Sequence, residues 1–258
     1  MKDSETKNKF GTQVGEYDKY RTEYPKEFYD YLFNLVKTKT LKNILDIGCG
    51  TGKSTEPLYH AGINVVGCDH DSKMLDQAKK NAKDRNLPID YIKCESENLP
   101  FDDNSFDVIT IGNAFHWFAN EKAVKNLERV LRPWGLLFIH WKQIEKRDVE
   151  LRRKIFRHFN PEYDGAGILI TPEEVIKLLK DHNLQNITHI TREYKSTYTL
   201  ESAVGRLKTV GGYFSLSSEQ KKEFDDFATK ILGDYLDKKG KIEFVPTTQI
   251  VYAYKKEK

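Results

Sequence analysis

The chain has 258 residues, of which 31% are charged, and its formal net charge is only +3. This length suits one domain with an elaboration or a small cap, and it is long enough to bury a sizeable core. The weak basicity is spread along the chain, which argues against a nucleic-acid partner. Neither a secretory signal nor an apolar run of membrane-spanning length is evident, so we expect no membrane association.

The first part of the chain alternates between helix and strand patterns. Polar residues 1–15 precede a predicted helix at 16–39, whose apolar residues recur at helical spacing. The elements that follow are strands at 41–47, 63–69, 89–94, 106–111 and 136–141, and helices at 54–60, at 72–85 with Ser72 as N-cap, and at 120–131. Strands that alternate with helices predict right-handed βαβ units and a parallel sheet.

The pattern changes after Trp141. The elements predicted there are helices at 145–159, 172–182, 200–208 and 217–238, and strands at 187–199 and 241–254. Strands that lack a crossover helix on one side often form an antiparallel edge on a parallel sheet. We therefore expect the end of the chain to complete a mixed sheet.

Three cysteines, Cys49, Cys68 and Cys94, each end a predicted strand. Their spacing matches neither CxxC nor a Cys/His metal site, so we expect no metal. An odd number of scattered cysteines argues for a reducing compartment, and the predicted location is the cytoplasm. Each cysteine is expected to act as small apolar filler.

The most specific motif is Asp46-x-Gly48-x-Gly50-x-Gly52, which joins a predicted strand to the next helix. Open α/β proteins bind nucleotide-like ligands at such a turn. A phosphate-binding P-loop requires four residues between its first glycine and its Gly-Lys pair, and Gly48 leaves only three. A dinucleotide fingerprint requires a third glycine where this chain has Lys or Thr. The spacing therefore disfavours both ligands.

The complete Asp-x-Gly-x-Gly-x-Gly sequence resembles motif I of the class I S-adenosylmethionine (SAM)-dependent methyltransferases. The resemblance implies an α/β, Rossmann-like fold with a seven-stranded, mostly parallel sheet, an antiparallel last strand, helices on both faces, and a helical lid and insertions. It implies N-terminal lid helices at 1–40, a SAM-binding core at 41–141, and a segment at 142–258 that completes the sheet and caps the acceptor side. The implied cofactor is SAM, and S-adenosylhomocysteine is its product.

Residues at the ends of later strands resemble the cofactor contacts of this family. Asp69 stands where a carboxylate accepts both ribose hydroxyls, and His70 follows it. The segment that begins at Glu95 resembles an acid–small–Glu–x–Leu-Pro-Phe segment of ubiquinone-type methyltransferases. That resemblance assigns Glu95 and Ser96 to the adenine, although Glu replaces the usual Asp. Asn113, after the strand at 106–111, is also expected to contact the cofactor.

Two further segments resemble a branch that includes the trans-aconitate-type carboxyl methyltransferases. The lid-like sequence Tyr-x-x-Tyr20-Arg21-x-x-Tyr-Pro implies that Tyr20 and Arg21 close over the methionine end of SAM, with Arg21 at its carboxylate. The sequence Phe-His116-Trp117-Phe makes His116 the catalytic candidate. The candidates for binding the acceptor are Trp117, Trp141, Arg206 and Tyr213.

We therefore expect a SAM-dependent methyltransferase that acts on a small-molecule acceptor, with carboxyl O-methylation favoured. One alternative is C- or O-methylation of a quinone-like or phenolic substrate, and another is a catalytically silent SAM-binding protein. A carboxylate is already ionised at neutral pH and needs only anchors. A phenol or an enol carbon benefits from a base, and a neutral His116 is suited to that role.

Overall fold

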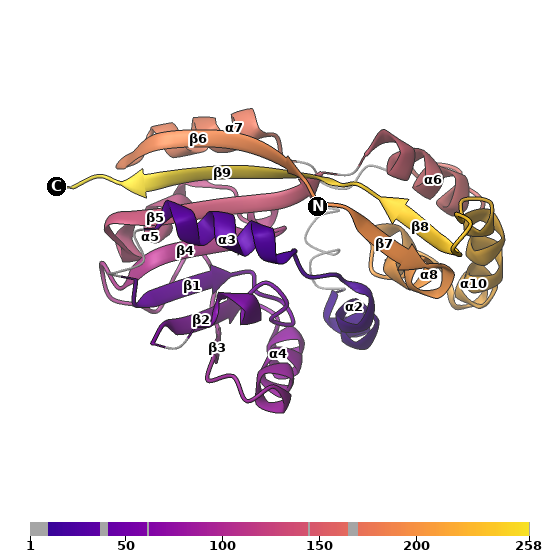
Figure 1. The fold of residues 1–258 in the computed structure, drawn as a ribbon, viewed down its shortest axis with the longest axis horizontal. Coiled ribbons are helices and arrows are strands. Elements are labelled where there is room, and N and C mark those ends of the chain that lie inside the picture. Colours follow the sequence, from indigo (N-terminus) through magenta and orange to yellow (C-terminus); the bar gives the residue numbers. More distant parts are fainter. Residues whose placement is uncertain (1–9, 37–40, 61, 144, 165–169, 258) are drawn as a thin grey trace. The chain divides into compact units, whose positions relative to one another are not determined.

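The computed structural model describes residues 10–36, 41–60, 62–143, 145–164 and 170–257, and it divides into two compact units (Figure 1). The core unit comprises Glu23–Lys142, Ile170–Arg192 and Thr248–Lys258. The second unit comprises Met1–Thr22, Gln143–Leu169 and Glu193–Thr247. Each unit is assembled from segments that are far apart in the sequence, and each has its own apolar core.

A seven-stranded sheet forms the centre of the core unit, in the order β3-β2-β1-β4-β5-β9-β6. Its strands are β1 (Asn43–Ile47), β2 (Asn64–Asp69), β3 (Asp90–Lys93), β4 (Phe106–Gly112), β5 (Leu131–Gln143), β6 (Leu184–Glu193) and β9 (Thr247–Lys255). The strands β1 to β5 pair in parallel, whereas the last strand, β9, runs antiparallel (Figure 1). The predicted Rossmann-like sheet is therefore confirmed.

Helices cover both faces of this sheet. They are α3 (Lys26–Leu35), α4 (Ser72–Asp84), α5 (Glu121–Val130) and α7 (Pro172–Lys180). Leu127 of α5 and Leu179 of α7 share an apolar cluster with Leu137 of β5. On the opposite face, Phe28 of α3 contacts Phe138, with 5.7 Å between the ring centroids. Because successive strand residues point to opposite faces, the nearly continuous apolar sequence of the central strands is buried on both sides.

The second unit is built mainly from helices around a short ribbon. Its elements are α2 (Val14–Tyr20), α6 (Lys146–Phe156), β7 (Ser196–Thr199), α8 (Leu200–Leu207), α9 (Gly211–Phe214), α10 (Ser218–Gly233) and β8 (Lys241–Phe244). The strands β7 and β8 pair antiparallel. Phe156 of α6 and Phe224 of α10 lie in one apolar cluster. Among the helices described in the two units, none is long and apolar enough to cross a membrane.

Two predicted strands are each divided between the two units. The strand expected at 187–199 forms β6 in the main sheet and β7 in the ribbon. The strand expected at 241–254 likewise forms β8 in the ribbon and β9 in the main sheet. Pro246 lies between β8 and β9, and proline has no N–H to donate to a strand ladder. The single continuous strands were therefore wrong predictions, although their strand character was confirmed.

Three predicted features of the helices also differ from the structure, and local residues explain each difference. The helix expected at 16–39 is divided into α2 and α3, with Pro25 as the N-cap of α3, and its residues 37–40 lie outside the described part of the chain. The helix expected at 54–60 is reduced to a 3-10 turn at Glu56–Leu58, which contains Pro57. The N-cap of α4 is Asp71 rather than Ser72, because the Asp71 carboxylate accepts a hydrogen bond from Lys73 N.

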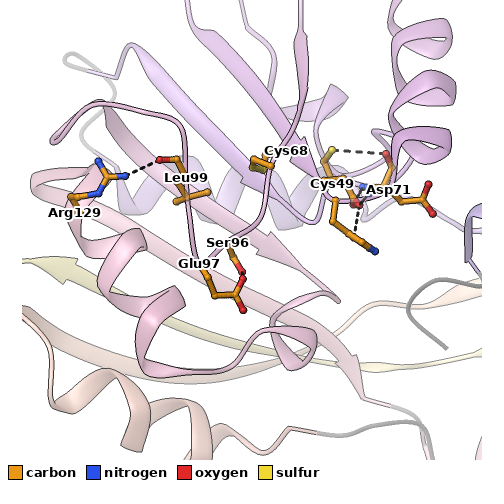
Figure 2. Close-up of a disulfide and its surroundings, with 11 residues drawn as sticks. Cys49, Cys68, Asp71, Ser96, Glu97, Leu99 and Arg129 are labelled. Carbon is orange, nitrogen blue, oxygen red and sulfur yellow. Dashed lines mark hydrogen bonds and ion pairs between the residues drawn. A yellow bond between two sulfur atoms is a disulfide. The ribbon is translucent and has the colours of Figure 1, made fainter. Parts of the chain in front are cut away.

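Cys68 and Cys94 form a disulfide, with 5.8 Å between their α carbons (Figure 2). Their pairing follows from the sheet, because β2 and β3 are parallel neighbours and Cys68 lies beside Ile92, two residues before Cys94. The prediction of three unpaired apolar thiols was therefore wrong for this pair, and only Cys49 is a free, buried cysteine. The cytoplasmic location stays a prediction.

Candidate active site

Three glycines of the loop after β1 adopt left-handed backbone conformations. The φ angles are +71° at Gly48, +56° at Gly50 and +87° at Gly52, a region that residues with a β carbon rarely adopt. A β carbon at Gly48 would also collide with the Ala114 side chain, and one at Gly52 would collide with the Tyr91 hydroxyl. The backbone conformation therefore favours glycine at all three positions, and space also requires it at Gly48 and Gly52, which leaves bare backbone along the turn.

Asp69, at the end of β2, is bound directly to this loop. Its Oδ2 accepts a hydrogen bond from Gly50 N at 2.9 Å, and its Oδ1 accepts one from Asp71 N at 2.9 Å. His70 Nδ1 lies 3.0 Å from the same Oδ1. Burial raises the pKa of Asp69, but the hydrogen bonds from His70, Asp71 and Gly50 outweigh it and hold the pKa below its usual value. Asp69 is therefore an ionised carboxylate fixed beside the glycine loop.

Asp46 is fully buried at the start of the loop. Its Oδ2 accepts hydrogen bonds from the Ser54 hydroxyl at 2.9 Å and the Thr55 hydroxyl at 2.6 Å. Its Oδ1 has no hydrogen-bond partner among the described residues. Burial raises the pKa of Asp46 to about 6, and the nearby charge of Asp69 adds to the effect. Asp46 therefore joins the start of the loop to the turn that follows it. Burial destabilises its ionised form.

We predict that Asp46 makes the protein less stable as the pH rises. Its pKa is about 6 in the folded state and 3.8 in a model residue, so the folded state binds more protons between these values. Relative to the Asp46→Asn variant, the wild type should lose on the order of 1 kcal/mol of unfolding free energy between pH 5 and pH 7.5. Urea unfolding of both proteins without ligand measures this difference. A constant difference across this pH range would contradict the prediction.

The segment after β3 carries the residues expected at the adenine. Glu95 is exposed, whereas Ser96 is buried, and its hydroxyl donates a hydrogen bond to Glu97 Oε2 at 2.7 Å. Glu97 Oε1 in turn accepts a hydrogen bond from Asn120 Nδ2 at 3.0 Å. Arg129 Nη2 donates to Leu99 O at 2.8 Å (Figure 2). The segment is therefore tied to α5 and its N-cap through Glu97 and Arg129.

The end of β4 holds Asn113 in a structural arrangement. Its φ is +53°, its Oδ1 accepts a hydrogen bond from Lys142 N at 2.9 Å, and its Nδ2 donates to the Tyr24 hydroxyl at 3.0 Å. Both ends of the amide therefore join β4 to β5 and to the segment before α3. Its expected role at the cofactor stays a prediction.

The catalytic candidate lies in a short turn beside the glycine loop. His116 and Trp117 are half-buried in a 3-10 turn at Phe115–Trp117, with 4.6 Å between their ring centroids. Ala114 at the start of this turn lies against Gly48, so the turn and the loop are neighbours. Trp141 is 6% exposed and lies in the core cluster. The loop, Asp69, His70 and the His116 turn are thus brought together.

Four other candidates lie in the second unit. The Tyr20 hydroxyl donates to Glu201 Oε1 at 3.2 Å, and Arg21 Nη2 donates to Thr209 O at 3.0 Å. Arg206 is paired with a carboxylate of α6, and Tyr213 is part of the buried apolar cluster. These contacts are all within the second unit, and the roles expected for the four residues stay predictions.

Sequence reasoning missed the residues that support the site. Arg129 and Glu97 hold the segment after β3, and Ser54 and Thr55 hold Asp46. Two signals were available: Glu97 belongs to the segment that resembles the ubiquinone-type methyltransferases, although it was given no role, and Ser54 and Thr55 are hydroxyl residues shortly after the loop. No local pattern marks Arg129, because most of its partners, which include the carbonyl groups of Leu99 and Phe101 and the carboxylate of Asp103, are distant in the sequence.

Comparisons with known proteins agree with this geometry. A family model described as a methyltransferase domain matches residues 45–139. An uncharacterised methyltransferase of Mycobacterium tuberculosis is 34% identical over 183 residues, which are 70% of this chain and 71% of that protein. The structure of a putative methyltransferase from Bacillus halodurans aligns with a TM-score of 0.58 and 17% sequence identity. The alignment covers 88% of this chain and 98% of that protein's chain.

The chain therefore belongs to the class I SAM-dependent methyltransferases. A further relative is the demethylmenaquinone methyltransferase of Paenarthrobacter aurescens, which is 40% identical over 102 residues, or 39% of each chain.

Proposed function

We propose that this methyltransferase transfers its methyl group to a small-molecule acceptor and that the favoured acceptor atom is a carboxylate oxygen. The observation that supports SAM as the methyl donor is the hydrogen bond between the Asp69 carboxylate and the Gly50 amide. It fixes an ionised carboxylate beside a stretch of backbone free of side chains. An uncharged adenosine needs this pair of features, because it has hydroxyls to donate and no phosphates to neutralise.

The residues of the core unit fit SAM. Each oxygen of a carboxylate has two lone pairs. The Asp71 amide and His70 Nδ1 use those of Oδ1, and the Gly50 amide uses one of Oδ2, so Asp69 Oδ2 retains capacity for one ribose hydroxyl. The space that a β carbon would fill at Gly48 is already occupied by Ala114, so only bare backbone fits beside it. We assign the ribose to Asp69, the adenine to Glu95 and Ser96, and the donor loop to the three glycines.

SAM supplies an activated methyl group, and the chain's own residues must align the acceptor and exclude water. The acceptor must lie about 3–3.5 Å from the methyl carbon in an in-line arrangement. A carboxylate acceptor arrives ionised and needs no base. In this proposal His116 donates a hydrogen bond that orients the carboxylate, and Trp117 shields it from water.

A second candidate acceptor is a quinone-like or phenolic ring. The demethylmenaquinone methyltransferase relative favours it, although the match covers only 39% of this chain. For such an acceptor His116 would have to remove a proton. The two acceptor classes therefore assign His116 different roles, and a single substitution distinguishes them.

We predict that His116→Gln retains most methyl transfer to a carboxylate, because Gln can still donate a hydrogen bond. If His116 is instead the base for a phenol or ring carbon, the rate should fall by about 10²–10⁴. Initial rates with tritiated SAM and each class of acceptor measure the effect. The matched control is His60→Gln, an exposed histidine of the core unit, which should change neither rate. A large loss with a carboxylate acceptor would contradict the favoured assignment.

A further inference from the structure

The helix α6 of the second unit buries two opposite charges on one face. Asp148 and Arg152 are four residues apart, a spacing at which acid and base often pair along a helix. Their exposed fractions are 6% and 7%. Asp148 is instead paired with Arg206 of α8, whose two terminal nitrogens lie 3.3 and 3.4 Å from Asp148 Oδ2. The only carboxylate on this face is thus already bound.

The guanidinium of Arg152 is incompletely paired. Its buried Nε has no hydrogen-bond acceptor among the described residues. Burial lowers the pKa of Arg152 to about 10, and the positive charges of Arg206 and Arg21 add to the effect, whereas Asp148 and Tyr163 oppose it. Arg21 also has a buried Nε that no described residue accepts from. Arg152 therefore lies within the influence of two other guanidinium groups, and the nearby carboxylate, Asp148, is bound to Arg206.

This arrangement is costly unless an anion completes it. A buried charge without a partner is strongly destabilising, whereas a paired one is tolerated. Arginine forks match carboxylate and phosphate groups in geometry, and the open donors of Arg152 and Arg21 are suited to either. The second unit thus contains a cationic site in which some hydrogen-bond donors of the guanidinium groups have no acceptor among the described residues.

We propose that Arg152, together with Arg206 and Arg21, binds a small molecule that carries an oxyanion, either a carboxylate or a phosphate group. The site lies wholly within the second unit, and binding there does not depend on methyl transfer. The proposal assigns Arg21 and Arg206, which the sequence placed at SAM and at the acceptor, to this ligand instead. It assigns a role to α6, a helix for which the sequence offered only a charged surface.

Thermal unfolding of the full chain tests the site, with glutarate and inorganic phosphate as probes and neutral glutaramide as the uncharged control. With ionic strength held constant, saturating glutarate or phosphate should raise the melting temperature by about 3 °C or more, and glutaramide should not. The relative size of the two responses shows whether carboxylate or phosphate is preferred.

The decisive variant is Arg152→Met, which removes the charge and keeps an unbranched, apolar side chain. Its melting temperature without anion should equal or exceed that of the wild type, because an incompletely paired buried charge is gone, and its response to anion should disappear. The control is Lys154→Met, an exposed lysine of the same helix, which should respond as the wild type does. The proposal is overturned if neither anion stabilises the wild type, or if Arg152→Met responds unchanged.

Discussion

Replacing Asp69 by Asn should weaken SAM binding by about 100-fold or more. A hydrogen bond from a ribose hydroxyl to a carboxylate is worth roughly 1.5–3 kcal/mol. In addition, Asp69 accepts the Gly50 and Asp71 amides on opposite oxygens, so either orientation of an Asn amide places an NH₂ group against an N–H donor. The substitution therefore removes a ribose contact and disturbs the loop that carries it.

Equilibrium dialysis with labelled SAM measures this loss, and Asp76→Asn provides the control. Asp76 is exposed on α4, so its substitution removes the same charge from the same unit without touching the loop. The control should bind SAM within about two-fold of the wild type, as expected for an exposed charge. An Asp69→Asn protein that remains folded and binds SAM as tightly as the control would refute the assignment of Asp69 to the ribose.

The second large effect is expected at Gly48, where Ala should cost about 2–5 kcal/mol of unfolding free energy. A left-handed residue with a β carbon is strained, and this β carbon would collide with Ala114. Ala114 begins the His116 turn, so any relaxation would move that turn away from the loop. Methyl transfer should therefore fall even in protein that remains folded.

Urea unfolding compares Gly48→Ala with Gly233→Ala. Gly233 ends α10, and a β carbon there meets no atom within 4 Å. The control should be neutral or more stable by up to about 1 kcal/mol, since Ala favours helix over Gly. Equal stabilities for the two variants would show that the Gly48 turn has room for a side chain, and the packing of the loop against Ala114 would be wrong.

The sequence was sufficient for most of the sheet and insufficient for the division into units. The central strands are apolar along their whole length, which is a local property, and they were predicted correctly within a few residues. The breaks after Glu193 and before Thr247 depend on which sheet each half pairs with. That choice is made by tertiary packing, although Pro246 marked one of the two breaks.

The candidate site shows the same limit. The glycine loop and Asp69 were predictable because their function requires particular residues at fixed spacing. Asn113 was expected at the cofactor, yet its amide joins Tyr24 to the backbone of Lys142. The sequence did not indicate a role for Arg152, because one arginine in a charged helix has no distinguishing pattern. Its importance appears only once burial and the pairing of Asp148 with Arg206 are known.

The central claim is methyl transfer from SAM to a carboxylate oxygen of a small molecule. The most direct measurement uses SAM with a tritiated methyl group, a panel of small carboxylic acids and phenols, and alkaline treatment of the products. A methyl ester releases labelled methanol in base, whereas an aryl ether or a C-methyl product keeps its label. We predict base-labile label with at least one carboxylic acid. Label that appears only in base-stable products, or SAM binding with no transfer to any acceptor, would contradict it.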